Sequence, residues 1–217
     1  MRNLRSAALV CLLTCSGWVA AEYSPDVLEL DGSRALEFPA VDELYLATGG
    51  TIEFWVSPDW TVSPAYDPAV VSNAGVEGAS YLVAVLRDRD GLGIVSGDAQ
   101  LMVGFDFTDN QLHHVALSYF EGQLAVYIDG QLRSSQPFEM VNLPASGFWI
   151  GTADGSSAPF VGAIAALRVW GTPVAQEDIV KYAARDVRDG TSGHPDTEAL
   201  RAISDFNEAD LLLPADQ

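Results

Sequence analysis

Residues 111–132 read QLHHVALSYFEGQLAVYIDGQL, and this stretch predicts two successive β-hairpins. Residues 112–119 and 123–128 are apolar, or alternate with a period of two, over the length of a strand. A turn that contains glycine follows each segment. The second turn, Asp129-Gly130, is a strong hairpin signal because both central residues of such a two-residue turn take positive φ. The stretch therefore predicts antiparallel strands.

The chain beyond residue 25 repeats this pattern, with turn residues at short intervals, which is typical of a β-sandwich or barrel. In the segment TIEFWV, the side chains of Ile52, Phe54 and Val56 fall on one face of a strand. Gly32 allows a hairpin-like turn between the first two strands because it takes positive φ at little cost. The other expected strands occupy residues 27–30, 35–38, 80–86, 92–95, 100–107, 148–150, 163–170 and 200–206, with 148–150 and 163–170 as a strand pair.

One helix is predicted close to the C-terminus. Thr172 can cap this helix, and Pro173 then occupies its first position. Ile179 and Tyr182 belong to an apolar stripe that faces the rest of the protein. The helix is expected to be an appendage of a single domain that spans residues 22–217.

The first 21 residues are expected to be a signal peptide. Arg2 and Arg5 precede a short apolar run, and small residues lead to a cleavage site after Ala21. The run is too short to cross a membrane, so we expect a secreted or periplasmic protein without integral membrane insertion. Both cysteines, Cys11 and Cys15, would be removed, which excludes a disulfide scaffold or a thiol nucleophile. Alternatively, Cys15 becomes the lipidated N-terminus of a lipoprotein.

The charge of the chain excludes some partners. The formal net charge is -19, and it becomes -21 without residues 1–21, which contain two arginines and no acidic residue. Such a chain has no basic patch to displace phosphate counterions, so nucleic acid is not an expected partner. Anionic lipid surfaces are disfavoured for the same reason. The acidity is compatible with cation binding, with a salty medium, or simply with solubility.

Five blocks of sequence follow one another along the chain: LELDGSRALEFP, TIEFWVSPDW, LHHVALSYFEGQLAVYIDGQL, IGTADGSSAPFVGAIAALRVWGTPVAQEDI and ALRAISDFNEADLLL. In content and order they resemble motifs of the laminin-G-like domains of the concanavalin A-like lectin and glucanase superfamily. The resemblance covers residues 27–213 and implies an all-β, antiparallel two-sheet jelly-roll sandwich with one short peripheral helix. It implies little about function, because the family includes lectins, adhesion modules and appendages of enzymes.

Two departures from the family pattern bear on function. Leu112 stands where the family has a tryptophan, and we interpret it as a conservative change at a core position. Ala165 and Ala166 replace an Asp-Glu pair that often contributes to calcium binding in relatives, and a calcium ion needs six to eight oxygen ligands. The Glu-x-Asp-x-x-Glu motif of the superfamily's glucanases is absent from the sequence, so we do not expect an enzyme.

The two adjacent histidines are expected to be structural. Neighbouring side chains on a strand point to opposite faces, so His113 and His114 cannot easily share a metal ion. We expect one of them to be half-buried and hydrogen-bonded and the other to be solvated. Glu53 is interpreted as an exposed carboxylate on a sheet face, and His194, in a polar loop, supplies no obvious partner for a metal site.

Four residues are candidates for ligand binding. Asp31 and Asp154 match places where relatives keep acidic groups, and they are the candidate ligands for a possible calcium cofactor. The alternative is that these turn aspartates bind their own backbone. Trp60 and Tyr66, in the loop SPDWTVSPAYDP, are the candidate aromatic platform for a sugar. The alternative is that they pack this loop onto the sandwich.

The sequence favours a secreted, non-catalytic recognition module that binds a glycan or a protein at the cell surface. Its binding loops are expected around residues 57–78 and 152–160. Two alternatives stay open: a divergent glycan hydrolase or lyase, and a structural component of an envelope assembly.

Overall fold

The computed structural model describes residues 27–187, 192–204 and 206. The expected signal peptide, residues 1–21, lies outside this part of the chain. The strands are β1 Val27–Asp31, β2 Leu36–Phe38, β3 Gly50–Pro58, β4 Ala69–Gly75, β5 Gly78–Val85, β6 Gly91–Ser96, β7 Ala99–Gly104, β8 His113–Phe120, β9 Gln123–Ile128, β10 Gln131–Pro137, β11 Gly147–Ile150, β12 Val161–Trp170 and β13 Leu200–Ser204. The helices are α1 Gln176–Tyr182 and two 3-10 helices, η1 Asp42–Leu44 and η2 Thr197–Ala199.

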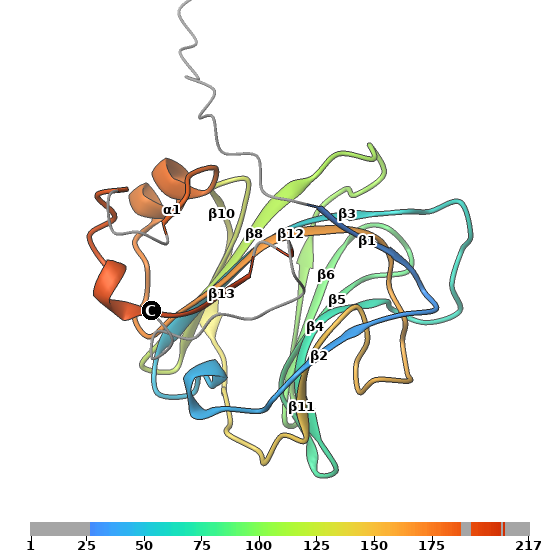
Figure 1. The fold of residues 1–217 in the computed structure, drawn as a ribbon, viewed down its shortest axis with the longest axis horizontal. Helices are drawn as coiled ribbons and strands as arrows, with labels where there is room; N and C mark the ends of the chain where they lie inside the picture. The colour runs from blue at the N-terminus through green and yellow to red at the C-terminus, as the bar shows by residue number, and fades with distance from the viewer. Residues whose placement is uncertain (1–26, 188–191, 205, 207–217) are drawn as a thin grey trace, which may run out of the picture.

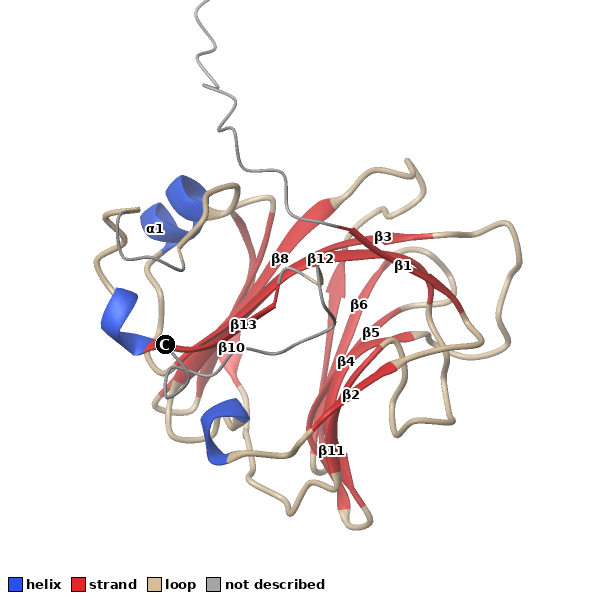
Figure 2. Ribbon diagram, in the orientation of Figure 1, coloured by secondary structure: helices blue, strands red, loops and turns tan. Residues whose placement is uncertain are grey.

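These strands form two antiparallel sheets that face each other (Figure 1). The large sheet has the order β1-β12-β3-β8-β9-β10, and β13 pairs with β12 beyond the end of β1. The small sheet has the order β2-β11-β4-β5-β6-β7. Strands dominate the structure, and the short helices lie at its periphery (Figure 2). The predicted all-β, antiparallel two-sheet sandwich is confirmed.

The turns of the opening stretch have the predicted geometry. Asp129 and Gly130 have φ values of 51° and 71°, as the turn between β9 and β10 requires. Glu121 and Gly122, between β8 and β9, have φ values of 47° and 79°. Both hairpins therefore have two-residue turns whose positive φ matches the right-handed twist of the paired strands.

Two predicted strand pairings are wrong. β1 pairs with β12 and β2 pairs with β11, so the turn at Gly32 leads the chain from one sheet to the other. Likewise, β11 belongs to the small sheet and β12 to the large sheet. The strand and turn patterns indicate where strands begin and end. The partner of each strand depends on how the two sheets share one core, which is a tertiary property.

The core lies between the inner faces of the sheets. Ile52, Phe54 and Val56 are fully buried on one face of β3, as predicted. They pack with apolar side chains from both sheets in one continuous cluster. Leu112 is not in this core, contrary to the prediction, because it precedes β8 and its side chain is 36% exposed.

A second, smaller core covers part of the outer face of the large sheet. Helix α1 lies over this face beside β8 and β10 (Figure 1). Ile179 and Tyr182 of the helix are buried against Trp170 and Ile203 of the sheet. The predicted helix is confirmed, but it begins later than expected. Its N-cap is Ala175, whereas the carbonyl of Thr172 accepts a hydrogen bond from the Thr51 hydroxyl at 3.0 Å.

Helix α1 has seven residues. Within the described ranges, no helix has the length and apolar character that crossing a bilayer requires.

Candidate functional site

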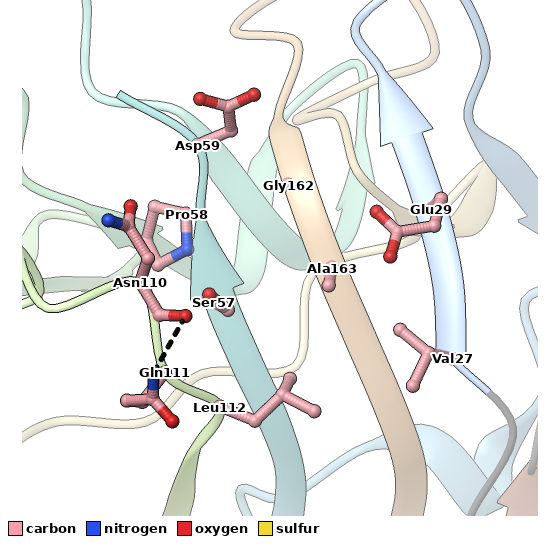
Figure 3. Close-up of a pocket in the computed structure, with 10 residues that line it drawn as sticks. All are labelled: Val27, Glu29, Ser57, Pro58, Asp59, Asn110, Gln111, Leu112, Gly162 and Ala163. Carbon is pink, nitrogen blue, oxygen red and sulfur yellow. Dashed lines mark hydrogen bonds between the residues drawn. The ribbon is translucent and has the colours of Figure 1, made fainter. Parts of the chain in front are cut away.

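An open groove of about 560 Å³ lies on the part of the large sheet that the helix does not cover (Figure 3). Three neighbouring strands, β1, β12 and β3, form it together with the segment that leads into β8. Its lining residues, which define the outer groove, are Val27, Glu29, Ser57, Pro58, Asp59, Asn110, Gln111, Leu112, Gly162 and Ala163.

The floor of the outer groove is low because β12 carries small residues there. Ala163 is in register with Glu29 of β1 on one side and with Ser57 of β3 on the other. Gly162 has a φ of 141°, and a Cβ at this position would lie 2.3 Å from the carbonyl oxygen of Ser57. Glycine is therefore needed where β12 closely approaches β3.

The walls of the outer groove combine apolar and polar groups. Val27 and Leu112 expose 41% and 36% of their surface. Glu29 and Asp59 are exposed acidic residues, and the Asp59 Oδ1 atom accepts a hydrogen bond from the Thr61 amide at 2.8 Å. Hydroxyl groups of a ligand could bond to the carboxylates and to the amides of Asn110 and Gln111, while its apolar faces contact the exposed aliphatic groups.

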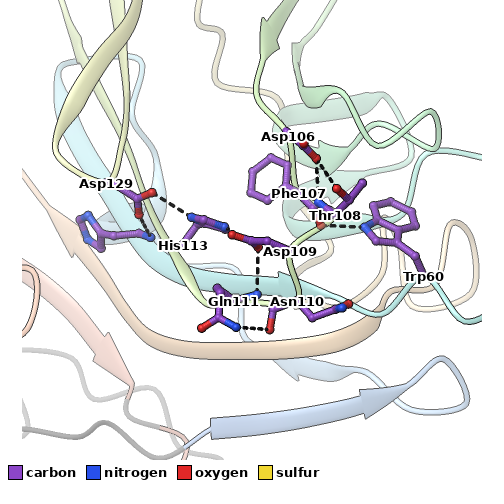
Figure 4. Close-up of polar contacts among 10 residues, drawn as sticks. Trp60, Asp106, Phe107, Thr108, Asp109, Asn110, Gln111, His113 and Asp129 are labelled. Carbon is purple, nitrogen blue, oxygen red and sulfur yellow. Dashed lines mark hydrogen bonds and ion pairs between the residues drawn. The ribbon is translucent and has the colours of Figure 1, made fainter.

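One wall is held in place by a histidine between two carboxylates (Figure 4). The Nε2 atom of His113 lies 3.0 Å from Asp109 Oδ1, and its Nδ1 atom lies 2.8 Å from Asp129 Oδ2. Burial lowers the pKa of His113, but the hydrogen bonds to both aspartates outweigh burial and raise the pKa above its ordinary value. His113 thereby ties the segment that carries Asn110 to the β9–β10 turn.

His114 lies on the opposite face of β8, as the strand geometry predicts, but neither histidine is solvated as we expected for one of them. His114 is buried, and its Nε2 atom lies 3.2 Å from Glu53 Oε2. The prediction of an exposed Glu53 is also wrong, because only 3% of Glu53 is exposed. The second core and helix α1 cover this face, which the local alternation of β3 does not reveal.

Glu53 is the acceptor of a buried polar network. Its Oε1 atom accepts hydrogen bonds from Arg168 Nη1 and from the Trp170 indole, both at 3.1 Å. Burial raises the pKa of Glu53, but the Arg168 guanidinium and the hydrogen bond with His114 outweigh burial and lower the pKa to about 2. The ring of His194 stacks on that of Trp170 with a centroid distance of 4.3 Å.

The two candidate aromatic residues have different environments. The Trp60 indole donates a hydrogen bond to the carbonyl of Phe107 at 3.0 Å, and the Arg89 guanidinium lies 5.3 Å from its ring centroid. Tyr66 is 39% exposed. The loop that carries both residues is shorter than predicted, because β3 extends to Pro58 and β4 begins at Ala69. Trp60 follows the groove residue Asp59, and a role of Trp60 or Tyr66 in sugar binding stays a prediction.

The two candidate calcium ligands bind their own loops. Asp31 Oδ1 accepts hydrogen bonds from the amide and hydroxyl of Ser33, which lower its pKa. Asp154 Oδ1 accepts hydrogen bonds from Ser157 and Ser156, which lower its pKa to about 2. Within the described residues, no three His, Cys, Asp or Glu side chains are grouped so that they could hold a metal ion. Calcium binding by Asp31 and Asp154 stays a prediction.

Most residues of the outer groove were not singled out in the sequence. In the sequence, Glu29 is one acidic residue of a strand with alternating polarity, and Gly162 and Ala163 have no polar side chain. Their importance depends on the pairing of β12 with both β1 and β3, which joins segments more than 100 residues apart. Only residues 57–59 lie in a region where binding was expected.

A family model described as the concanavalin A-like lectin/glucanases superfamily matches residues 30–180. A search of curated proteins gave no match.

Three solved structures have similar folds. A proposed carbohydrate-binding protein from Bacteroides ovatus has a TM-score of 0.58 and 17% identity, with 79% of this chain and 49% of that chain covered, so this chain spans about half of its length. Domain 4 of the GH43 extracellular arabinanase AbnA from Geobacillus stearothermophilus, in complex with arabinotriose, has a TM-score of 0.53 and 18% identity, with coverage of 73% and 78%. The CBM40 module of the Ruminococcus gnavus IT-sialidase, bound to α2,3-sialyllactose, has a TM-score of 0.51 and 13% identity, with coverage of 72% and 97%.

Proposed function

The chain belongs to the concanavalin A-like lectin/glucanases superfamily, and from this premise we propose that it is a secreted or periplasmic, non-catalytic module that binds a glycan in the outer groove. The observation that carries the proposal is the groove itself. Its low floor at Gly162 and Ala163 is flanked by exposed aliphatic and hydrogen-bonding side chains. This combination suits a sugar, which has both apolar faces and hydroxyl groups.

The similar solved structures support a glycan as the ligand. The arabinanase domain is in complex with arabinotriose, and the sialidase module is bound to α2,3-sialyllactose. Both share the fold of this chain at low sequence identity. They support the class of ligand, whereas the sugar itself has to follow from the residues of this chain.

An enzymatic role has one observation in its favour, because Glu29 and Asp59 are two carboxylates in one groove. Glycoside hydrolysis needs a general acid whose pKa is raised, usually by burial. Both carboxylates are exposed on the surface. We therefore propose a binding module, and release of reducing sugar from a bound glycan would contradict the non-catalytic part of the proposal.

A glycan array tests the proposal. We expect the wild-type protein to bind a defined group of glycans and the Ala163→Leu variant to lose this binding, because a leucine side chain would fill the floor of the groove. Ala79→Leu, at a half-buried alanine of β5 in the small sheet, is the matched control and should bind like the wild type. A blank array for the wild type, or equal binding by both variants, would contradict a glycan site in this groove. A blank array would favour a protein partner or a structural role.

The proposed location depends on the N-terminal segment. We expect the mature protein to begin at Glu22, after removal of the signal peptide. Mass spectrometry of the protein exported by its host distinguishes a free Glu22 from a lipidated Cys15.

A further inference from the structure

Charge in the outer groove has only one sign. Among the ten described residues that line it, Glu29 and Asp59 are acidic, and lysine, arginine and histidine do not occur. Glu29 comes from β1 and Asp59 follows β3, with β12 between these two strands (Figure 3). A ligand that lies along the floor at Ala163 therefore has a carboxylate on either side.

Both carboxylates are available to a ligand. In the described part of the chain, Glu29 makes no side-chain hydrogen bond or ion pair. Asp59 uses its Oδ1 atom to accept the Thr61 amide hydrogen bond, and an ionised carboxylate has further acceptor sites on both oxygens. The net charge of -19 for the whole chain adds a negative potential around the groove.

A hard metal ion does not fit this arrangement. Calcium takes six to eight oxygen ligands, usually from several carboxylates. The described residues contain no group of three acidic or histidine side chains that could bind a metal ion. An ammonium group needs less, because a single carboxylate can accept its hydrogen bonds and balance its charge.

Resting on the proposed glycan-binding function, we propose that the outer groove selects glycans with free amino groups, because Glu29 and Asp59 flank its uncharged floor. A protonated amino sugar would form ion pairs with one or both carboxylates. A uronic acid, a sialic acid or a sulfated sugar would bring a second negative charge beside them and would be repelled. Neutral sugars would bind through their hydroxyl groups alone.

Three oligosaccharides of equal length test this selectivity: a β-1,4-linked glucosamine oligomer, its fully N-acetylated counterpart, and an oligogalacturonate. Binding to the full-length secreted protein is measured by calorimetry at low and at physiological salt. We expect the amino oligomer to bind about 2- to 30-fold more tightly than the acetylated oligomer, which is the range that two exposed ion pairs supply. This preference should decrease with salt, and the oligogalacturonate should not bind.

Two variants with the same change in net charge provide the control. The Glu29→Gln, Asp59→Asn variant should lose the preference, so that it binds the amino and the acetylated oligomer with equal affinity. The Glu77→Gln, Asp98→Asn variant changes two carboxylates of a separate pocket and should keep the preference. If both variants reduce the preference for the amino oligomer to the same extent, the overall charge of the protein, and not the groove, attracts the amino groups. That result would overturn the inference.

The outcomes separate the inference from the proposed function. Equal binding of the amino and acetylated oligomers, or binding of the oligogalacturonate, would overturn the selectivity and leave glycan binding intact. No binding of any of the three oligomers, combined with a blank glycan array, would overturn both.

Discussion

Replacement of Glu53 by glutamine is expected to lower the free energy of unfolding by about 3 kcal/mol, the cost of breaking a buried ion pair. Glu53 accepts hydrogen bonds from Arg168 and Trp170 and pairs with His114. Arg168 also donates to the carbonyls of Tyr182 and Arg185 at the end of helix α1. The substitution keeps the shape of the side chain but removes the negative charge that Glu53 places beside the buried Arg168 guanidinium.

The magnitude follows from the pKa of Glu53. This pKa is about 2 in the folded protein and 4.5 ordinarily, so the folded state favours the carboxylate by about 3–4 kcal/mol, at about 1.4 kcal/mol for each pH unit. Solvent screening does not reduce this value much, because only 4% of the side chain is exposed. The loss of one partner from a buried ion pair costs about 3–5 kcal/mol, which agrees with this value.

The pH dependence has a definite sign. Because folding lowers the pKa of Glu53, its contribution is fully present above pH 4.5 and is lost as the pH falls towards 2. The difference in stability between the wild type and Glu53→Gln should therefore be largest near neutral pH and should decrease in acid. Other carboxylates affect both proteins alike, so the difference isolates Glu53.

Urea unfolding followed by tryptophan fluorescence measures this difference, and the thermal midpoint should fall by about 6–12 °C. Glu29→Gln is the control, because Glu29 is an exposed carboxylate of the same sheet and its substitution should change the stability by less than about 0.5 kcal/mol. A loss below about 1 kcal/mol in Glu53→Gln, or a difference that does not decrease in acid, would refute the reasoning.

Three further predictions concern the groove wall and the candidate ligand residues. Because folding raises the pKa of His113, protonated His113 should stabilise the fold fully below pH 6.5, and this stabilisation should decline as the pH rises through the pKa of the folded protein. In His113→Gln this decline should be absent when the free energy of unfolding is measured as a function of pH. Trp60→Phe removes the indole hydrogen bond and should cost about 1 kcal/mol in urea unfolding. The buried indole nitrogen of Trp149 has no hydrogen-bond partner in the described structure, so Trp149→Phe should lower the stability less. An equal loss of stability in the two variants would contradict a role for the Trp60 hydrogen bond. If Asp31 and Asp154 serve only their own loops, the thermal midpoints in calcium and in chelator are equal, and a midpoint that rises with calcium would instead support the predicted calcium site.

Local features of the fold could be predicted from the sequence. The positive φ values at Asp129 and Gly130 follow from turn chemistry, and the burial of Phe54 follows from the period of two in its strand. The environment of Glu53 could not be predicted this way, because a distant segment covers its face of the sheet. The floor of the groove at Ala163 could not be predicted either, because it forms only where β12 pairs with two strands that are remote in sequence.

A bulge in β12 explains why the outer groove is open. The register of β12 against β3 shifts between Ala165 and Arg168, and Ala166 has a φ of 48° in the left-handed region. Before the bulge, β12 pairs with β1 and presents the small residue Ala163 to the outer face. After it, β12 pairs with β13 and contributes Trp170 to the second core beneath helix α1.

The bulge therefore divides the outer face of the large sheet into a covered half and an open half. The bulge lies at Ala165 and Ala166, at the position of the Asp-Glu pair in the laminin-G-like sequence pattern. Both alanines are buried. Since acidic side chains at these two positions would be buried, the carboxylates available to a ligand on this face are those at the edges of the groove, Glu29 and Asp59. The alanine pair thus separates the structural Glu53 network from the proposed binding surface, whose charged residues are in its walls.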